Sequence, residues 1–160
     1  MSAIAIVVIG VIVIVALFIL GGAIWFAWDS DKRVRTFAHS TDLIPGKPGR
    51  APDEWTTATS PEALLHRRIR YAIADVHQVP TIPNSPAAMA ARDRLDQAVF
   101  SLDDQLIAAA ELTGDERTER VAQLEQAVVA LEAAPTKLWD ASNEQQTQDL
   151  DELTAELERA

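Results

Sequence analysis

Residues 86–112 read PAAMAARDRLDQAVFSLDDQLIAAAEL and set the fold class of the chain. Small and aliphatic residues recur there every three to four positions, at Ala88, Ala91, Leu95, Ala98, Val99, Leu102, Leu106 and Ala109. This spacing places them on one face of a long helix, with the near-3.5-residue repeat of coiled-coil-like packing. Because an apolar stripe is stable only when it is buried against other elements, we expect a bundle of helices.

Start and stop signals divide the flanking sequence into further helices. Ser60-Pro61-Glu62 and Ser85-Pro86 each combine a capping serine with a proline at the first helical position. In Thr113-Gly114-Asp115-Glu116, the glycine suits the left-handed residue after a helix, and Thr113 with Glu116 fits a capping box. We expect Pro135 to interrupt the helix that follows.

Apolar residues at helical spacing predict the buried faces of these other helices. The first helix carries Leu64, Leu65, Ile69, Ala72, Ile73 and Val76. The third carries Val121, Leu124, Val128 and Leu131. The last is expected to place on one side Leu138, Trp139, Leu150, Leu153 and Leu157. Residues 60–160 are therefore predicted to form an all-α domain, a small antiparallel bundle of three or four helices.

Charge is unevenly distributed in this chain, whose formal net charge is −10. Residues 87–160 carry six basic and 17 acidic side chains, whereas residues 41–86 carry five of each. Such an acidic region repels the phosphates of nucleic acid and anionic lipid headgroups. We therefore expect no nucleic-acid partner, and we favour a protein partner for the acidic bundle.

A second decisive stretch lies near the N-terminus, where residues 3–28 contain no charged side chain. About 20 apolar residues suffice to cross a bilayer as a helix. No lysine or arginine precedes the run, and it ends in the bulky sequence IWFAW, so it differs from a cleavable signal peptide. We predict a retained single-pass transmembrane helix followed by a short basic flank, together spanning residues 1–36.

The flanking residues predict how this anchor is placed. Trp25 and Trp28 are aromatic residues of the kind that sit at the membrane–water interface. Lys32, Arg33 and Arg35 follow directly, and basic residues close to a span favour the cytoplasmic side. The expectation is a protein of the cell membrane with its N-terminus outside and its helical domain in the cytoplasm, while the opposite orientation stays open.

Residues 37–59 are predicted to be a linker, because prolines and glycines that break helices are concentrated there. They are Pro45, Gly46, Pro48, Gly49 and Pro52. Trp55 is an exception in this polar stretch. It could pack on the domain or lie against the membrane, and the sequence leaves both open.

Candidate contact residues occur at three places. The cluster His66, Arg67, Arg68 and Arg70 could bind anionic headgroups or an acidic partner, or could pair with the domain's own carboxylates. Trp139 follows Pro135 at an expected helix junction, where it is either buried or an anchor for a partner. Together with Trp55, these are the predicted partner or lipid contacts.

Motifs that indicate a catalytic or nucleotide-binding site are missing from the sequence. It contains no cysteine, no nucleophile elbow, no Walker loop and no dinucleotide fingerprint. His66 and His77 lie about 16 Å apart by helical rise, too far to share one metal ion. We therefore predict no catalytic residue, cofactor or metal site.

The predicted function is a non-enzymatic accessory subunit or scaffold of a membrane protein complex, and homo-oligomerisation stays open. The alternative is a membrane-surface sensor that binds anionic lipid through the basic cluster.

An N-terminal span followed by a small helical bundle resembles the layout of LemA-type membrane proteins. The string Asp42-Leu43-Ile44-Pro45 is similar to a short piece of that family's sequence, but here it continues into Gly46-Lys47-Pro48-Gly49. The resemblance is one of architecture, and it assigns no role to any residue.

Overall fold

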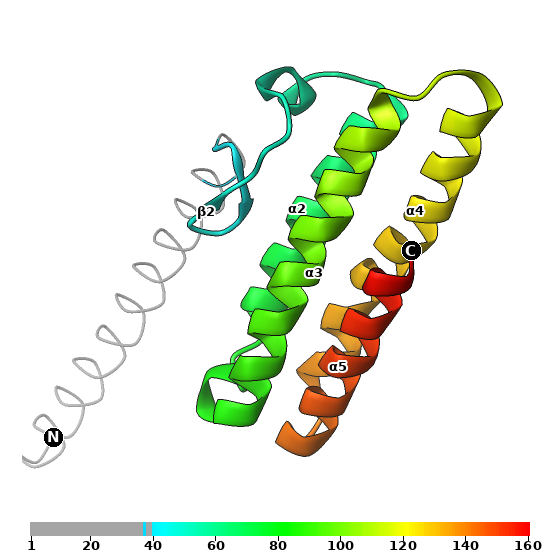
Figure 1. The fold of residues 1–160 in the computed structure, drawn as a ribbon. Coiled ribbons are helices and arrows are strands. Elements are labelled where there is room, and N and C mark those ends of the chain that lie inside the picture. The colour runs from blue at the N-terminus through cyan, green and yellow to red at the C-terminus, as the bar shows by residue number, and fades with distance from the viewer. Residues whose placement is uncertain (1–36, 38–39) are drawn as a thin grey trace, which may run out of the picture. The chain divides into compact units, whose positions relative to one another are not determined.

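The computed structural model describes residue 37 and residues 40–160. Of the two units into which the chain divides, the second is Thr41–Ala160 (Figure 1). Within the described residues no helix has both the length and the apolar character needed to cross a membrane. The predicted span over residues 3–28 lies outside the described part of the chain, as do the predicted interface residues Trp25, Trp28, Lys32, Arg33 and Arg35.

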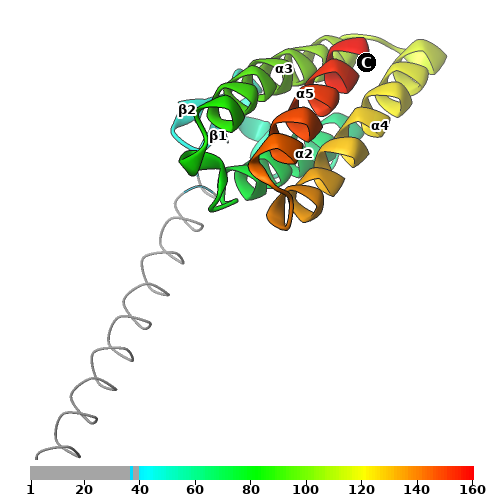
Figure 2. The same ribbon diagram turned by 90° about the horizontal axis from the view of Figure 1, so that it is seen from below.

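Residues 41–160 form a bundle of four α-helices, as predicted for the soluble part. The helices are α2 (Pro61–His77), α3 (Pro86–Ala110), α4 (Gly114–Trp139) and α5 (Asn143–Arg159). Successive helices run in opposite directions, with α2 beside α4 and α3 beside α5 (Figures 1 and 2). A short 3-10 helix, η2 (Ile82–Asn84), joins α2 to α3.

The core of the bundle is aliphatic and centres on the stripe predicted for α3. Leu95, Leu102 and Leu106 of that stripe are fully buried. The other helices add fully buried partners, among them Ile69, Ile73, Leu124, Leu131 and Leu150. Burying one such side chain stabilises the fold by about 1.5–3 kcal/mol, so this stripe holds the four helices together.

Three of the four helices begin with a serine that caps the first turn. The Ser60 hydroxyl accepts from the Ala63 N–H and the Ser85 hydroxyl from the Ala88 N–H, both at 3.3 Å. Ser142 caps α5 in the same way. At the start of α4, Gly114 adopts a left-handed φ of +63° as its residue type predicts, but Thr113 makes no side-chain cap and the predicted capping box does not form.

The expectation that Pro135 interrupts a helix is wrong, because α4 continues through it to Trp139. Leu131, Ala134 and Leu138 form a buried stripe that crosses the proline. Burial of this stripe against the bundle outweighs the backbone hydrogen bond that proline cannot make. Leu138 and Trp139 therefore end α4 instead of belonging to the last helix, which begins after Ser142.

The C-terminal end of α5 lies against the middle of α4. With 17 residues, α5 is shorter than the 26-residue α4, whose first turns extend beyond it (Figure 1). Arg120 of α4 donates to the Ala160 carbonyl at 2.7 Å and also bonds Gln105 of α3. This arginine ties the end of α5 to two other helices.

The structure differs from the prediction in the segment before α2, where residues 41–59 fold onto the bundle. Strands β1 (Asp42–Ile44) and β2 (Lys47–Pro48) pair antiparallel, and the 3-10 helix η1 spans Asp53–Thr56. Leu43 and Ile44 are fully buried. Pro45 and Gly46, which the sequence indicates as helix breakers, form the hairpin turn with Gly46 at φ +80°. The compact domain therefore begins at Thr41 and not at residue 60.

Candidate interaction surface

Two arginines of the predicted basic cluster hold the segment before α2 on the bundle. Arg70 Nε donates to the Asp42 carbonyl at 2.7 Å, and its side chain is buried. Arg67 Nη1 donates to the carbonyls of Trp55 and Ala58, at 2.6 and 2.7 Å. These bonds fix the hairpin and the 3-10 helix η1 to α2, and they occupy both guanidinium groups inside the domain.

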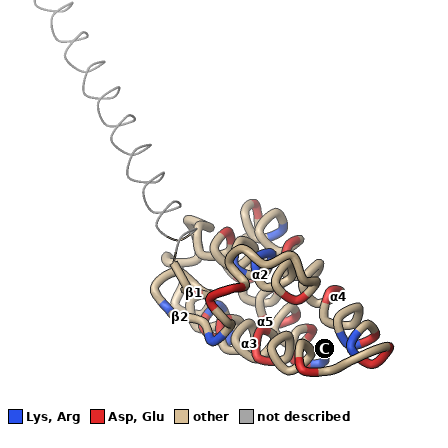
Figure 3. The backbone as a smooth tube through the Cα atoms, turned by 90° about the horizontal axis from the view of Figure 1, so that it is seen from above, with Lys and Arg blue, Asp and Glu red and all other residues tan. Residues whose placement is uncertain are grey.

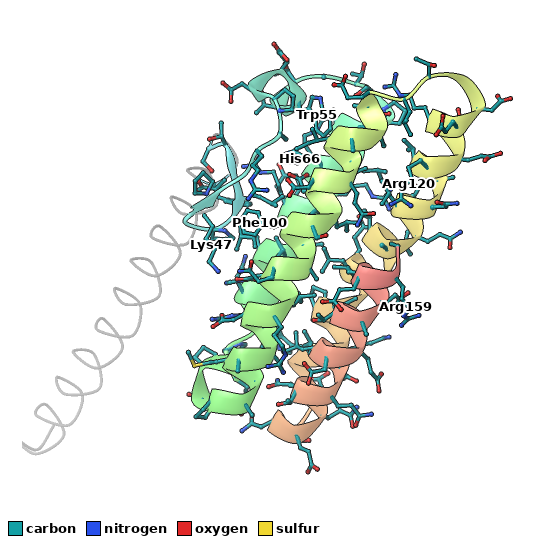
Figure 4. The ribbon with its side chains drawn as sticks, viewed as in Figure 1. Lys47, Trp55, His66, Phe100, Arg120 and Arg159 are labelled. Atoms are coloured by element: carbon teal, nitrogen blue, oxygen red, sulfur yellow. The ribbon has the colours of Figure 1, made fainter. Side chains whose placement is uncertain are left out.

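His66 of the same cluster is buried and pairs with a carboxylate of α3. Its Nδ1 lies 2.6 Å from Asp103 Oδ1, and the edge of the Trp55 ring approaches the imidazole with centroids 5.7 Å apart (Figure 4). Trp55 is itself only 8% exposed. Of the two placements that the sequence leaves open for Trp55, the structure shows the one packed on the domain.

A second carboxylate of α3, Asp96, joins three elements. It is fully buried and lies 2.8 Å from both His77 Nε2 of α2 and Lys47 Nζ of β2. Burial alone would raise the pKa of Asp96, but the hydrogen bonds from His77 and Lys47 outweigh burial and lower that pKa below its ordinary value. The hairpin is thus tied to α3 through an ionised, buried carboxylate.

Arg68 connects α2 to α4. Its guanidinium bonds Glu132 and Glu125, with N–O distances of 2.8 Å to each. The hydrogen bonds that Arg68 donates to Glu132 and then to Glu125 raise the pKa of Arg68, and the bonds to Glu132 lower the pKa of that glutamate. About two turns nearer the start of both helices, Arg117 of α4 donates two hydrogen bonds to Glu62 of α2, at 2.6 and 2.8 Å.

The predicted basic cluster is therefore built into the domain at all four positions. His66 and Arg68 pair with carboxylates, while Arg67 and Arg70 bind backbone carbonyls. Sequence alone indicates the carboxylate pairing as one alternative. It does not indicate the carbonyl partners, because those belong to a segment that reads as a linker.

Large apolar side chains are exposed on both α2 and α4. Leu64 and Tyr71 on α2 are 46% and 54% exposed, and Val129 and Trp139 on α4 are 51% and 56% exposed. Leu64, Arg68 and Tyr71 follow one another at the four- and three-residue spacing of one helix face. On α4, Val129 falls between Glu125 and Glu132 at the same spacing.

The Arg68 bridge brings these two helix faces side by side. Arg68, which lies one turn from both Leu64 and Tyr71, bonds Glu125 and Glu132, and these two glutamates lie one turn on either side of Val129. We call this surface the α2/α4 face and define it by Leu64, Arg68, Tyr71, Glu125, Val129, Glu132 and Trp139. It combines exposed apolar side chains with carboxylates, on a domain whose acidic residues are spread over α3, α4 and α5 (Figure 3).

Two members of the α2/α4 face, Arg68 and Trp139, are among the contacts predicted from the sequence, which left Trp139 either buried or exposed as an anchor. The structure places Trp139 at the surface. Sequence patterning assigns Leu64 to the buried face of α2, but the structure places it outside. Its neighbour Leu65 is buried instead. Leu64 and Leu65 point about 100° apart around the helix, and helical periodicity alone does not choose which of them lies deeper in the bundle.

Further surface features of the described residues are two grooves beside α5. Two open grooves flank α5, one of about 750 Å³ that includes Ser85, Asn143 and Thr147, and one of about 250 Å³ that includes Ala133, Leu138 and Leu153. Over residues 40–160, no group of three or more His, Asp or Glu side chains is placed to hold a metal ion.

No protein-family model matches this chain, no curated protein matches its sequence, and no solved structure matches its fold.

Proposed function

We propose that this chain is a non-enzymatic, single-pass membrane protein whose helical bundle binds another protein, as an accessory subunit or scaffold of a membrane complex. The anchor in this proposal is the uncharged run of residues 3–28. The observation that supports the binding role is the α2/α4 face, where four large apolar side chains are exposed on two adjacent helices.

The composition of this face is what favours a protein partner. Single exposed apolar residues are common on soluble proteins, but grouped ones mark interaction surfaces. Tyrosine and tryptophan are also enriched among the residues that dominate binding energy at interfaces. Each square ångström of apolar surface buried contributes about 25 cal/mol, so covering Tyr71, Trp139 and their neighbours would favour association.

Affinity purification tests the proposal. The full chain, tagged after Ala160 and expressed at its natural level, would be purified from gently solubilised membranes. We expect a defined partner protein at constant stoichiometry. A control chain keeps residues 41–160 and carries an unrelated single-span helix in place of residues 1–36. It should retain the partner, because the bundle is the proposed binding part. Recovery of the chain alone would contradict the proposal.

The alternative function, binding of anionic lipid, relies on the basic cluster, whose arginines all bond inside the domain. Co-sedimentation of residues 41–160 with anionic and neutral vesicles separates the two functions. Binding that requires anionic lipid and is lost when Arg68 becomes Glu would favour the alternative. We expect no binding to either kind of vesicle, because the acidic domain is repelled by anionic headgroups.

A further inference from the structure

We propose that the α2/α4 face docks a basic amphipathic helix of a partner protein. This inference rests on the proposed function and names the chemistry of the partner. The apolar side of the partner helix would cover Leu64, Tyr71 and Val129, and its lysines or arginines would face the carboxylates around them. The occupant is one helix, because the apolar residues lie along two neighbouring helices.

The spacing of the exposed side chains fits a helical ligand. Leu64 and Tyr71 are seven residues apart, which is about 10 Å along α2. Val129 and Trp139 are ten residues apart, about 15 Å along α4. An amphipathic helix that lies in such a seam presents its own apolar residues at positions i, i+3 or i+4, and i+7. Two to three turns of a partner helix therefore match the length of the face.

Charge complementarity selects a basic partner. Arg68 neutralises only one of its two glutamate partners, so the centre of the face keeps a net negative charge. Asp75, one turn after Tyr71, and Asp140, next to Trp139, are exposed and add two negative charges, of which the exposed Lys137 offsets one. Residues 41–160 as a whole carry 11 basic and 22 acidic side chains. A second copy of this domain or an anionic lipid surface would meet like charge, which opposes both.

The Arg68 bridge leaves room for the partner's cations. The Glu125 and Glu132 side chains are 52% and 37% exposed even though both bond Arg68. An ionised carboxylate can accept about four hydrogen bonds, so each glutamate can bind a lysine or arginine of the partner without releasing Arg68. The bridge holds both carboxylates in fixed positions, so these side chains lose less conformational entropy when the partner binds.

Site-specific photocrosslinking in the full chain, in its native membrane, tests the inference. Tyr71 would be replaced by p-benzoylphenylalanine, an aromatic of similar shape at an exposed position. The matched control places the same residue at Gln97, an exposed position on α3 outside the α2/α4 face. From position 71 we expect adducts to a segment of another protein in which Lys or Arg alternates with Leu or aromatic residues at helical spacing. From position 97 we expect none of these adducts.

Several results would overturn the inference. One is an adduct from position 71 to a second copy of this chain, to lipid or to an acidic segment. Another is an equal yield of the same adducts from position 97. A third is the absence of any adduct from position 71. Placing carboxylates among the apolar side chains of the face gives a second measurement, in the double variant Leu64→Glu and Val129→Glu. We expect it to reduce the adduct yield at position 71 at least tenfold. Met89→Glu, which changes an exposed apolar residue on α3, should leave the yield unchanged.

The same double variant separates this inference from the proposed function. If the purified chain keeps its partner when Leu64 and Val129 are both glutamate, the docking site is wrong while the binding role stands. If the unmodified chain has no partner, the proposed function itself fails. Circular dichroism of the double variant should match that of the unmodified chain, because both side chains are exposed.

Discussion

Asp96 shows how a single buried residue can link three elements. Its carboxylate is fully buried, yet it is kept ionised by His77 of α2 and Lys47 of β2. Burial opposes ionisation, and the two hydrogen-bonded partners outweigh it, so the pKa of Asp96 in the folded protein is lower than in the unfolded chain. A lowered folded pKa contributes stability at pH values above the unfolded pKa, and this stability is lost as the pH falls through the folded pKa.

The pH dependence of unfolding tests this linkage. An unfolded aspartate titrates near pH 3.9, so we expect the free energy of unfolding to fall as the pH is lowered from about 5 towards 3. In Asp96→Asn the decrease over this range should be smaller, because one linked carboxylate is gone, and stability at pH 7 should be lower. Urea unfolding followed by circular dichroism at pH 7, 5 and 3 measures both. If the free energy of unfolding fell equally with pH in both proteins, the proposed linkage between Asp96 ionisation and stability would be contradicted.

Gly46 is the residue on which the hairpin turn depends. Its φ of +80° is unfavourable for residues with a Cβ, and a Cβ added there would meet no atom within 4 Å. Gly46→Ala should therefore cost about 1–2 kcal/mol through backbone conformation alone. Gly46→Asn is the matched control and should cost less, because asparagine tolerates the left-handed region. Equal stability of the alanine variant and the natural chain in urea unfolding would show that the turn does not require glycine.

At the scale of elements, α4 is the helix whose course follows packing and not local propensity. Pro135 lacks the N–H that would bond the carbonyl four residues earlier, and within a helix this costs about 3 kcal/mol. The helix nevertheless continues because Leu138 beyond the proline is buried. A proline also stiffens the unfolded chain, which offsets up to about 1 kcal/mol of that cost.

Pro135→Ala should therefore stabilise the domain, by about 2 kcal/mol, because the backbone hydrogen bond is restored and the helix keeps its course. Thermal and urea unfolding measure the change. Ala133→Pro, two residues away on an exposed site of the same helix, is the control and should destabilise by a similar or larger amount. A loss of stability in Pro135→Ala would mean that the proline ring itself contributes essential packing.

For the molecule as a whole, the hairpin and the bundle share one core. Leu43 and Ile44 are fully buried, and Arg70, Arg67 and Lys47 make hydrogen bonds between the segment and the helices. Residues 41–58 should therefore unfold together with the bundle, in one transition.

Ile44→Ala tests this shared core. Truncating a fully buried isoleucine costs about 2–5 kcal/mol, whereas the same change in a free linker would cost nothing measurable. Thr59→Ala, at an exposed position of the same segment, is the control and should stay within about 0.5 kcal/mol of the natural chain. Unchanged stability in Ile44→Ala would show that the hairpin is not part of the cooperative unit.

Sequence predicts the candidate surface only in part, and particular residues show why. Trp139 stands out as an aromatic at a helix junction, so its exposure is one of two expected outcomes. Leu64 reads as core because it fits the apolar period of α2, and Val129 follows the buried Val128. Which of two adjacent apolar residues faces solvent depends on the rotation of the helix in the bundle, and the neighbouring helices set that rotation.

The sequence by itself determined the class of the fold and the starts of most helices. The α3 stripe repeats over about six turns, and each serine cap acts on its own first turn, so both signals are local. Only the tertiary structure decided the course of α4 through Pro135, the burial of Leu43, Ile44 and Trp55, and the pairing of His66, Arg68 and Asp96. These features depend on contacts between residues far apart in sequence, whose burial outweighs the weak local preferences of proline, glycine and linker-like segments.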